Sequence, residues 1–171
     1  MNKMITIAIV VLGFSILASA NLPGAVISPN AIGLRLGGGF GVGGAEISYQ
    51  RASNFDNRLE MDLGWYTGST ADPYRYWSQL GLAGIYQWDW NITDGLNWYV
   101  GPGAAVNIYS GNYDNDNSGI GLSVGGQIGI EYNFESAGAP ILLSLDVRPM
   151  WGFLNNGGGG GDGAFSIRYT Y

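Results

Sequence analysis

The sequence contains no cysteine and no histidine, and charged side chains make up only 12% of its 171 residues. The missing cysteine excludes disulfide bonds, thiolate nucleophiles and zinc-finger sites. The missing histidine excludes the usual catalytic triads and most catalytic zinc sites. Lys and Arg together number 7 against 13 Asp and Glu, which leaves no basic patch for nucleic acid. Because soluble domains average about 25% charged residues, so little charge beside 30 glycines is unusual for a soluble protein.

The first twenty residues have the three-part layout of a secretory signal peptide. Lys3 gives a basic start, residues 4–17 are almost wholly apolar, and Ala18-Ser19-Ala20 supplies the small residues that signal peptidase accepts. The apolar run is short for a hydrocarbon layer of about 30 Å, which disfavours a retained helical anchor. We therefore divide the chain into a signal peptide at 1–20, a short periplasmic segment at 21–30 and a β-barrel at 31–171.

The rest of the chain alternates between apolar and polar residues with a period of two. In one segment, for example, Leu59 and Met61 alternate with Glu60 and Asp62. Ile85 is an exception, since it falls on the polar face of its segment. This period predicts strands, and no apolar run is long enough for a spanning helix. Eight strands are expected, at Ala31–Gly38, Ala45–Arg51, Arg58–Tyr66, Ser78–Trp90, Asn97–Tyr109, Gly119–Phe134, Ile141–Trp151 and Ala164–Tyr171.

Ten charged residues lie on the second face of these strands, among small residues such as Gly, Ala and Ser. They are Arg35, Glu46, Arg58, Glu60, Asp62, Asp89, Glu131, Asp146, Arg148 and Arg168. In a soluble lipid-binding barrel this face would be wetted outside, whereas in a transmembrane barrel it would line the lumen. In the second case the charges form either a salt-bridge network between neighbouring strands or a narrow polar conduit for ions. We expect the network, because unpaired charge in a lumen of low dielectric constant is costly.

Large aromatic residues gather at the strand ends and favour the transmembrane class. Amphipathic rings at both ends of the strands match the two interfacial girdles of a membrane barrel. The expected girdle residues are Trp65, Trp88, Trp90, Trp98, Tyr132, Trp151, Tyr169 and Tyr171.

The connections between the strands fit the same class. Three turns on the side of the termini are predicted to be periplasmic, and the four longer connections opposite them external. The turns are 53–57, 91–96 and 135–140, and the external connections are 38–44, 67–77, 110–118 and 152–163. Within the last of these, the glycine run 157–161 predicts a loop.

The last strand carries the most specific pattern, Phe165-x-Ile167-x-Tyr169-x-Tyr171. Together with the signal peptide and the eight alternating segments, it resembles the small bacterial outer-membrane β-barrels, such as the OmpA transmembrane domain, OmpX and the opacity-type proteins. The commonest last residue of that family is Phe, and this chain has Tyr. The resemblance implies a monomeric, eight-stranded antiparallel up-and-down barrel in the bacterial outer membrane. It would be surrounded by lipid and lipopolysaccharide, with these four residues read by the barrel-assembly machinery.

One polar segment has two interpretations. Asp114, Asp116 and Ser118 reproduce the first half of a calcium-binding loop, but the position of the bidentate Glu is occupied by Gly125. The segment is either a solvated hairpin loop, which we favour, or a weak divalent-cation site.

The sequence predicts no cofactor and no catalytic residue. The expected role is therefore structural or surface-directed and acts through the external loops. The alternatives are a narrow channel through the lumen and a soluble periplasmic lipid-binding barrel.

Overall fold

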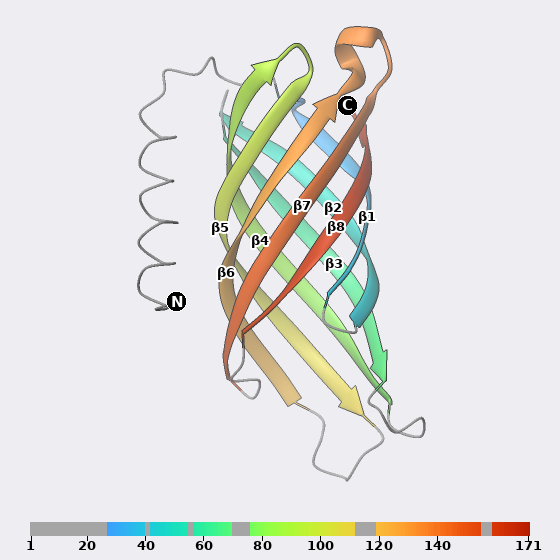
Figure 1. The fold of residues 1–171 in the computed structure, drawn as a ribbon, viewed down its shortest axis with the longest axis vertical. Coiled ribbons are helices and arrows are strands. Elements are labelled where there is room, and N and C mark those ends of the chain that lie inside the picture. Colours follow the sequence, from blue (N-terminus) through green and yellow to red (C-terminus); the bar gives the residue numbers. More distant parts are fainter. Residues whose placement is uncertain (1–26, 40–41, 55–56, 70–75, 112–118, 155–158) are drawn as a thin grey trace, which may run out of the picture.

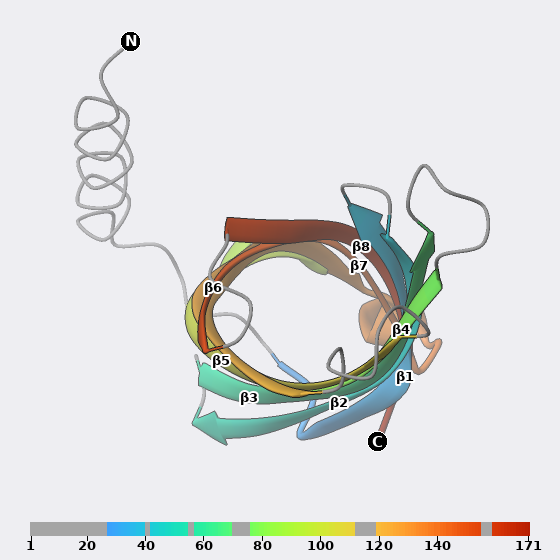
Figure 2. The ribbon, with the colours of Figure 1, turned by 90° about the horizontal axis from the view of Figure 1, so that it is seen from below.

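The computed structural model describes residues 27–39, 42–54, 57–69, 76–111, 119–154 and 159–171. They form a closed antiparallel barrel of eight strands, in which each strand pairs with the next and β8 pairs with β1 (Figures 1 and 2). The eight-stranded antiparallel barrel expected from the sequence is confirmed. The strands are β1 (Asn30–Gly39), β2 (Val42–Asn54), β3 (Asn57–Ser69), β4 (Tyr76–Thr93), β5 (Leu96–Gly111), β6 (Gly119–Asn133), β7 (Ile141–Leu154) and β8 (Gly159–Thr170).

The barrel closes where its first and last strands meet. β1 and β8 pair from Ala31 opposite Thr170 to Gly38 opposite Gly163. The backbones of Asn30 and Tyr171 then exchange two hydrogen bonds, at 3.2 and 3.0 Å. Closure pairs every strand on both sides, which removes the exposed edges that an open sheet would have. Both termini of the barrel lie at one end, called here the terminal end; the opposite end is called the distal end.

The connections at the terminal end are short. β4 and β5 are joined by Asp94-Gly95, where Gly95 has a φ of 73°, in the region that favours glycine. Between β6 and β7 lies a single-turn 3₁₀ helix, η1 (Phe134–Ala137). Asn133 caps η1 by accepting a hydrogen bond from the Glu135 backbone N–H, and therefore β6 ends before Phe134 rather than including it. Among the described residues, no helix is long and apolar enough to cross a membrane.

Several strands extend further towards the distal end than the sequence predicts. The largest difference is in β8, which begins at Gly159 instead of Ala164. The prediction of a loop through 157–161 is therefore wrong for its last three residues. There the backbone pairs with β7, with Gly161 opposite Pro149 and Gly159 opposite Trp151. Glycines carry no side chains that could alternate, so the backbone pairing left no signal in the sequence. The predicted signal peptide lies outside the described residues.

Candidate functional site: the charged barrel interior

All ten charged residues predicted for the lumen point into the barrel and are buried. They come from seven of the eight strands, because strict alternation sends every second side chain of a strand to the same face. The apolar residues of the opposite parity are exposed on the outside; Ile47 and Leu82, for example, are each 55% exposed. The distribution is thus inverted relative to a soluble protein, with charge inside and hydrocarbon outside.

Arg35 binds three carboxylates in the distal half of the lumen. Its guanidinium nitrogens lie 2.5 Å from Asp146, 2.9 Å from Glu46 and 2.6 Å from Asp162. The Asp162 side chain is 20% exposed, while those of Asp146 and Glu46 are almost fully buried. One arginine therefore connects β1 to β2, β7 and β8.

Arg148 extends this cluster across the lumen. Its guanidinium contacts Glu46 at 3.3 Å, Glu60 at 3.6 Å and, more closely, Asp62. Tyr66 donates a further hydrogen bond to Glu46. Since β7 is not a neighbour of β2 or β3, these pairs join opposite walls of the barrel.

Glu60 lies at the centre of a second group of contacts. Arg168 approaches Glu60 to 3.1 Å and also donates to Ser48 and Ser144. Three glutamine side chains donate further hydrogen bonds to the Glu60 carboxylate. They are Gln50 at 2.5 Å, Gln87 at 3.2 Å and Gln127 at 3.0 Å. A buried carboxylate with this many donors is well compensated for its loss of water.

Arg58 forms the third centre, towards the terminal end. It pairs with Asp89 at 3.1 Å and Glu131 at 2.5 Å, and its guanidinium lies 4.9 Å from the centroid of the Tyr99 ring. Tyr99 and Ile85 have no exposed surface, so they fill the lumen beside the charges.

The structure corrects the expected pattern of ion pairs. Neighbouring strands do pair, as Arg35 and Glu46 show, but Arg148 with Asp62 and Arg58 with Glu131 cross the lumen. Asp162 was not among the residues predicted to line the lumen, because the expected external connection 152–163 includes it. Asp162 lies an even number of residues from Arg168 and therefore faces the same side of β8. An expected strand that began at Gly159 would have placed Asp162 in the lumen.

Two aromatic residues also contribute to the interior. Tyr66 adjoins the girdle residue Trp65 but has the opposite parity, and it donates its hydroxyl into the lumen. Tyr99 follows Trp98 in the same way and is completely buried. The alternation of the strands assigns both residues to the inward face.

The predicted girdle residues lie on the outside of the barrel, near the strand ends. Trp65 and Trp151 are about 60% exposed at the distal side, and the others lie towards the terminal end. Trp90 stacks on Trp98 with ring centroids 4.5 Å apart, which leaves both rings partly covered. Tyr169 stacks on Tyr171 at 6.2 Å. The remaining girdle residues are Trp88 and Tyr132, at 38% and 36% exposure.

A polar cluster closes the wall at the terminal end. Ser28 donates to the Glu135 carboxylate at 2.8 Å and accepts from the Asn133 side chain at 3.2 Å. The polar side chain of Thr170 lowers the pKa of Glu135 from its usual value of 4.5; burial opposes this effect, and Ser28 and Asn133 add to it. The segment before β1 is thereby tied to η1, across the end of β8.

The possible cation site at Asp114, Asp116 and Ser118 lies outside the described residues. In the part of the chain that the structure describes, no three Asp or Glu side chains are arranged to hold a metal ion.

Comparison with known proteins finds the same architecture in solved outer-membrane β-barrels of eight strands. Neisserial surface protein A matches with a TM-score of 0.62 and 14% identity over 83% of this chain and 95% of its own. The N-terminal β-barrel domain of Pseudomonas aeruginosa OprF matches with a TM-score of 0.54 and 16% identity, over 85% and 100%. The attachment invasion locus protein Ail of Yersinia pestis matches with a TM-score of 0.53 and 14% identity, over 84% and 97%. No family model and no curated protein matches the sequence.

Proposed function

We propose that this chain is an integral protein of the bacterial outer membrane, with a structural or surface-interaction role and no catalytic activity. The observation that carries the proposal is the inverted polarity of the barrel. Leu34 and Leu63 are both about half exposed outside, whereas Arg35 and Asp62 are almost fully buried inside. Hydrocarbon is the solvent that stabilises such an outer face. The similar outer-membrane barrels support the same location.

In this proposal the terminal end faces the periplasm and the four distal connections face outward. The external connections are the parts of the chain that can meet a partner at the cell surface, and lipid and lipopolysaccharide surround the wall. The terminal strand, with Phe165, Ile167, Tyr169 and Tyr171, is the segment that the barrel-assembly machinery reads. The barrel acts as a monomer.

Two other functions have less support. A channel needs a continuous aqueous path, but Tyr99, Ile85 and Gln87 are fully buried in the lumen beside the ion pairs. A soluble lipid-binding barrel needs an apolar interior, yet the charges occupy that position here. The filled interior favours a protein that acts through its surface rather than through its lumen.

An epitope inserted between β5 and β6, within residues 112–118, tests the location and the orientation together. We expect intact cells to bind an antibody to this epitope, while the same epitope at Asp94-Gly95 is reached only after the outer membrane is opened. Fractionation should recover both proteins in the membrane, with migration on gels that changes on heating. Recovery in the soluble periplasmic extract, or labelling of both sites in intact cells, would contradict the proposal. Steady unitary conductance of the purified barrel in planar bilayers would favour the channel instead.

A further inference from the structure

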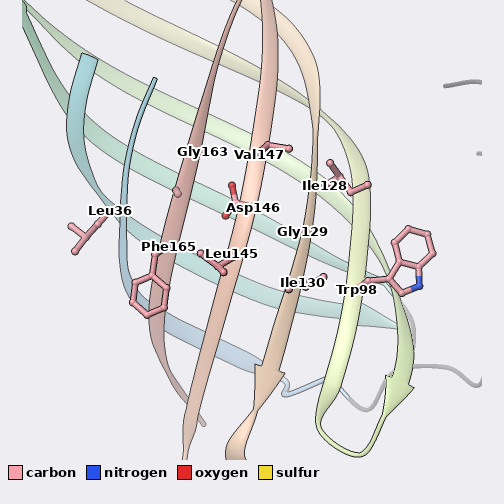
Figure 3. Close-up of a pocket in the computed structure, with 11 residues that line it drawn as sticks. Leu36, Trp98, Ile128, Gly129, Ile130, Leu145, Asp146, Val147, Gly163 and Phe165 are labelled. Carbon is pink, nitrogen blue, oxygen red and sulfur yellow. The ribbon is translucent and has the colours of Figure 1, made fainter. Parts of the chain in front are cut away.

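A groove of about 630 Å³ crosses the outer wall of the barrel between two rows of side chains (Figure 3). Each row consists of residues that lie opposite one another on successive strands. The first row is Leu36, Phe165, Leu145, Ile130 and Trp98, from β1 through β8, β7 and β6 to β5. The second row is Gly163, Val147 and Ile128. The groove therefore follows the direction of the strand-to-strand hydrogen bonds.

Its dimensions suit a single hydrocarbon chain. The two rows face each other across β6, β7 and β8 only, and because adjacent strands are about 4.8 Å apart, this two-walled part is about 10 Å long. The first row alone continues to Trp98 on β5 and to Leu36 on β1. Two residues along a strand separate the rows, which sets them about 7 Å apart. One leaflet of a bilayer is about 15 Å of hydrocarbon, half of the usual thickness of about 30 Å. The two-walled part therefore accommodates a segment of one acyl chain, and the first row extends the apolar contact at both ends.

The chemistry of the groove is apolar along its whole length. Its walls are aliphatic and aromatic side chains, and its floor is the backbone at Gly129, Asp146 and Ala164. The Asp146 carboxylate takes no part, because it points inward and is bound to Arg35 at 2.5 Å. A ligand in the groove is therefore recognised by its shape and its apolar surface.

Close packing does not require a glycine at position 163, where the groove is open. A Cβ at this position would meet only ordinary contacts, 3.7 Å from the Asp146 carbonyl and 3.8 Å from Val147. At Gly33, in contrast, a Cβ would lie 1.9 Å from a backbone carbonyl oxygen, so that glycine is required by close packing. A side chain at position 163 would therefore be compatible with the fold, but it would fill the groove.

The two ends of the groove differ in character. Trp98 lies two residues from the start of β5, at the terminal end, and stacks on Trp90. Indole rings favour the level of the lipid headgroups. The other end lies on β8 and β1, at Gly163 and Leu36, further from the terminal end. A lipid whose headgroup lies beside Trp98 would direct its chain into the groove.

We propose that this groove binds one acyl chain of a phospholipid from the periplasm-facing leaflet. The inference rests on the proposed membrane location and adds a specific lipid site to it. The headgroup lies at the level of Trp98, and the chain passes over Leu145 to end beside Gly163. Apolar contact with the two rows holds the chain in place.

Native mass spectrometry of the full chain tests the site. The folded barrel is reconstituted in nanodiscs of phosphatidylethanolamine and released into a mild detergent, and the phospholipid that stays bound is counted. Gly163→Leu fills the groove. Gly84→Leu is the matched control, because Gly84 is also an outward glycine, on β4, and a Cβ there meets no atom within 4 Å.

We expect one phospholipid per barrel for the unchanged protein and for Gly84→Leu. For Gly163→Leu we expect lipid retention that is weaker by about tenfold or more. If Gly163→Leu fails to show the gel shift of a folded barrel, Gly163→Ala, whose Cβ makes only ordinary contacts, replaces it. Absence of bound lipid in the unchanged protein, equal retention in both variants, or a lipid-free dimer would overturn the inference. A barrel that inserts but retains no lipid refutes this site alone, whereas a barrel that does not enter the nanodisc refutes the proposed function as well.

Discussion

Replacement of Arg35 by glutamine tests whether the buried network holds the barrel together. Among the described residues, Arg35 is the only basic partner of Asp146, to which it donates from Nη2 at 2.5 Å and from Nε at 3.2 Å. When Arg35 is replaced, the Tyr99 hydroxyl, 3.5 Å from the Asp146 carboxylate, still donates a hydrogen bond to it. Glu46 keeps Arg148, and Asp162 is exposed enough to be hydrated. The cost therefore falls mainly on one buried carboxylate.

A buried ion pair that loses one partner costs about 3–5 kcal/mol, because the remaining charge is left without compensation. We expect Arg35→Gln to lower the free energy of unfolding by that amount. The measurement is urea unfolding of the folded barrel in detergent, followed by tryptophan fluorescence and by heat-dependent gel mobility. Arg51→Gln is the control. Arg51 is exposed on the outer face of β2, and its replacement should change stability by less than about 0.5 kcal/mol.

The double variant Arg35→Gln with Asp146→Asn separates the lost pair from simple loss of volume. Once the carboxylate is neutral, no unpaired charge remains, and the double variant should be more stable than Arg35→Gln alone by about 1–3 kcal/mol. The reasoning would be refuted by a loss below about 1 kcal/mol in Arg35→Gln, or by two single effects that simply add.

Three further predictions concern other parts of the barrel. Gly33→Ala places a Cβ 1.9 Å from the carbonyl oxygen of Ile167, and we expect it to destabilise the barrel by about 1–3 kcal/mol in the same unfolding assay. The pKa of Glu135 is lowered by its polar neighbours, with Thr170 first, so its contribution to stability is present above pH 4.5 and is lost as the pH falls through the folded-state pKa. Unfolding at a series of pH values should therefore show a weaker loss in acid for Glu135→Gln than for the unchanged protein. Trp98→Ala removes a stacked indole pair and should cost about 0.5–1.5 kcal/mol beyond the lost burial, measured in bilayers.

The inward face of the barrel could be predicted because alternation is a local property. Whether Glu60 or Leu59 points inward depends only on the position of each along its strand, and the sequence shows this directly. Ile85 is informative in this respect. Its position in the alternation predicts the inner face, although its side chain is apolar, and it is fully buried there. Parity proved more reliable than hydrophobicity.

The partners of each charge could not be predicted in the same way. The pairing of Arg148 with Asp62 depends on the stagger between strands and on the barrel diameter, which are properties of the closed sheet. The extent of β8 was also hidden, because Gly159 and Gly161 pair through the backbone alone. Asp162 was consequently assigned to a loop, although it is the third carboxylate of Arg35.

The network also explains why the basic residues of the lumen are arginines. Lys3, the only lysine, lies in the predicted signal peptide. An eight-stranded lumen has little room for side chains, and it holds four guanidinium groups against seven carboxylates. Each cation must therefore serve several anions, as Arg35 and Arg148 do with three each. The planar guanidinium, with five N–H donors, can bridge carboxylates on different strands, whereas a lysine ammonium is a single, strongly hydrated point of charge. A lumen that is too small for many cations is thus expected to use arginine.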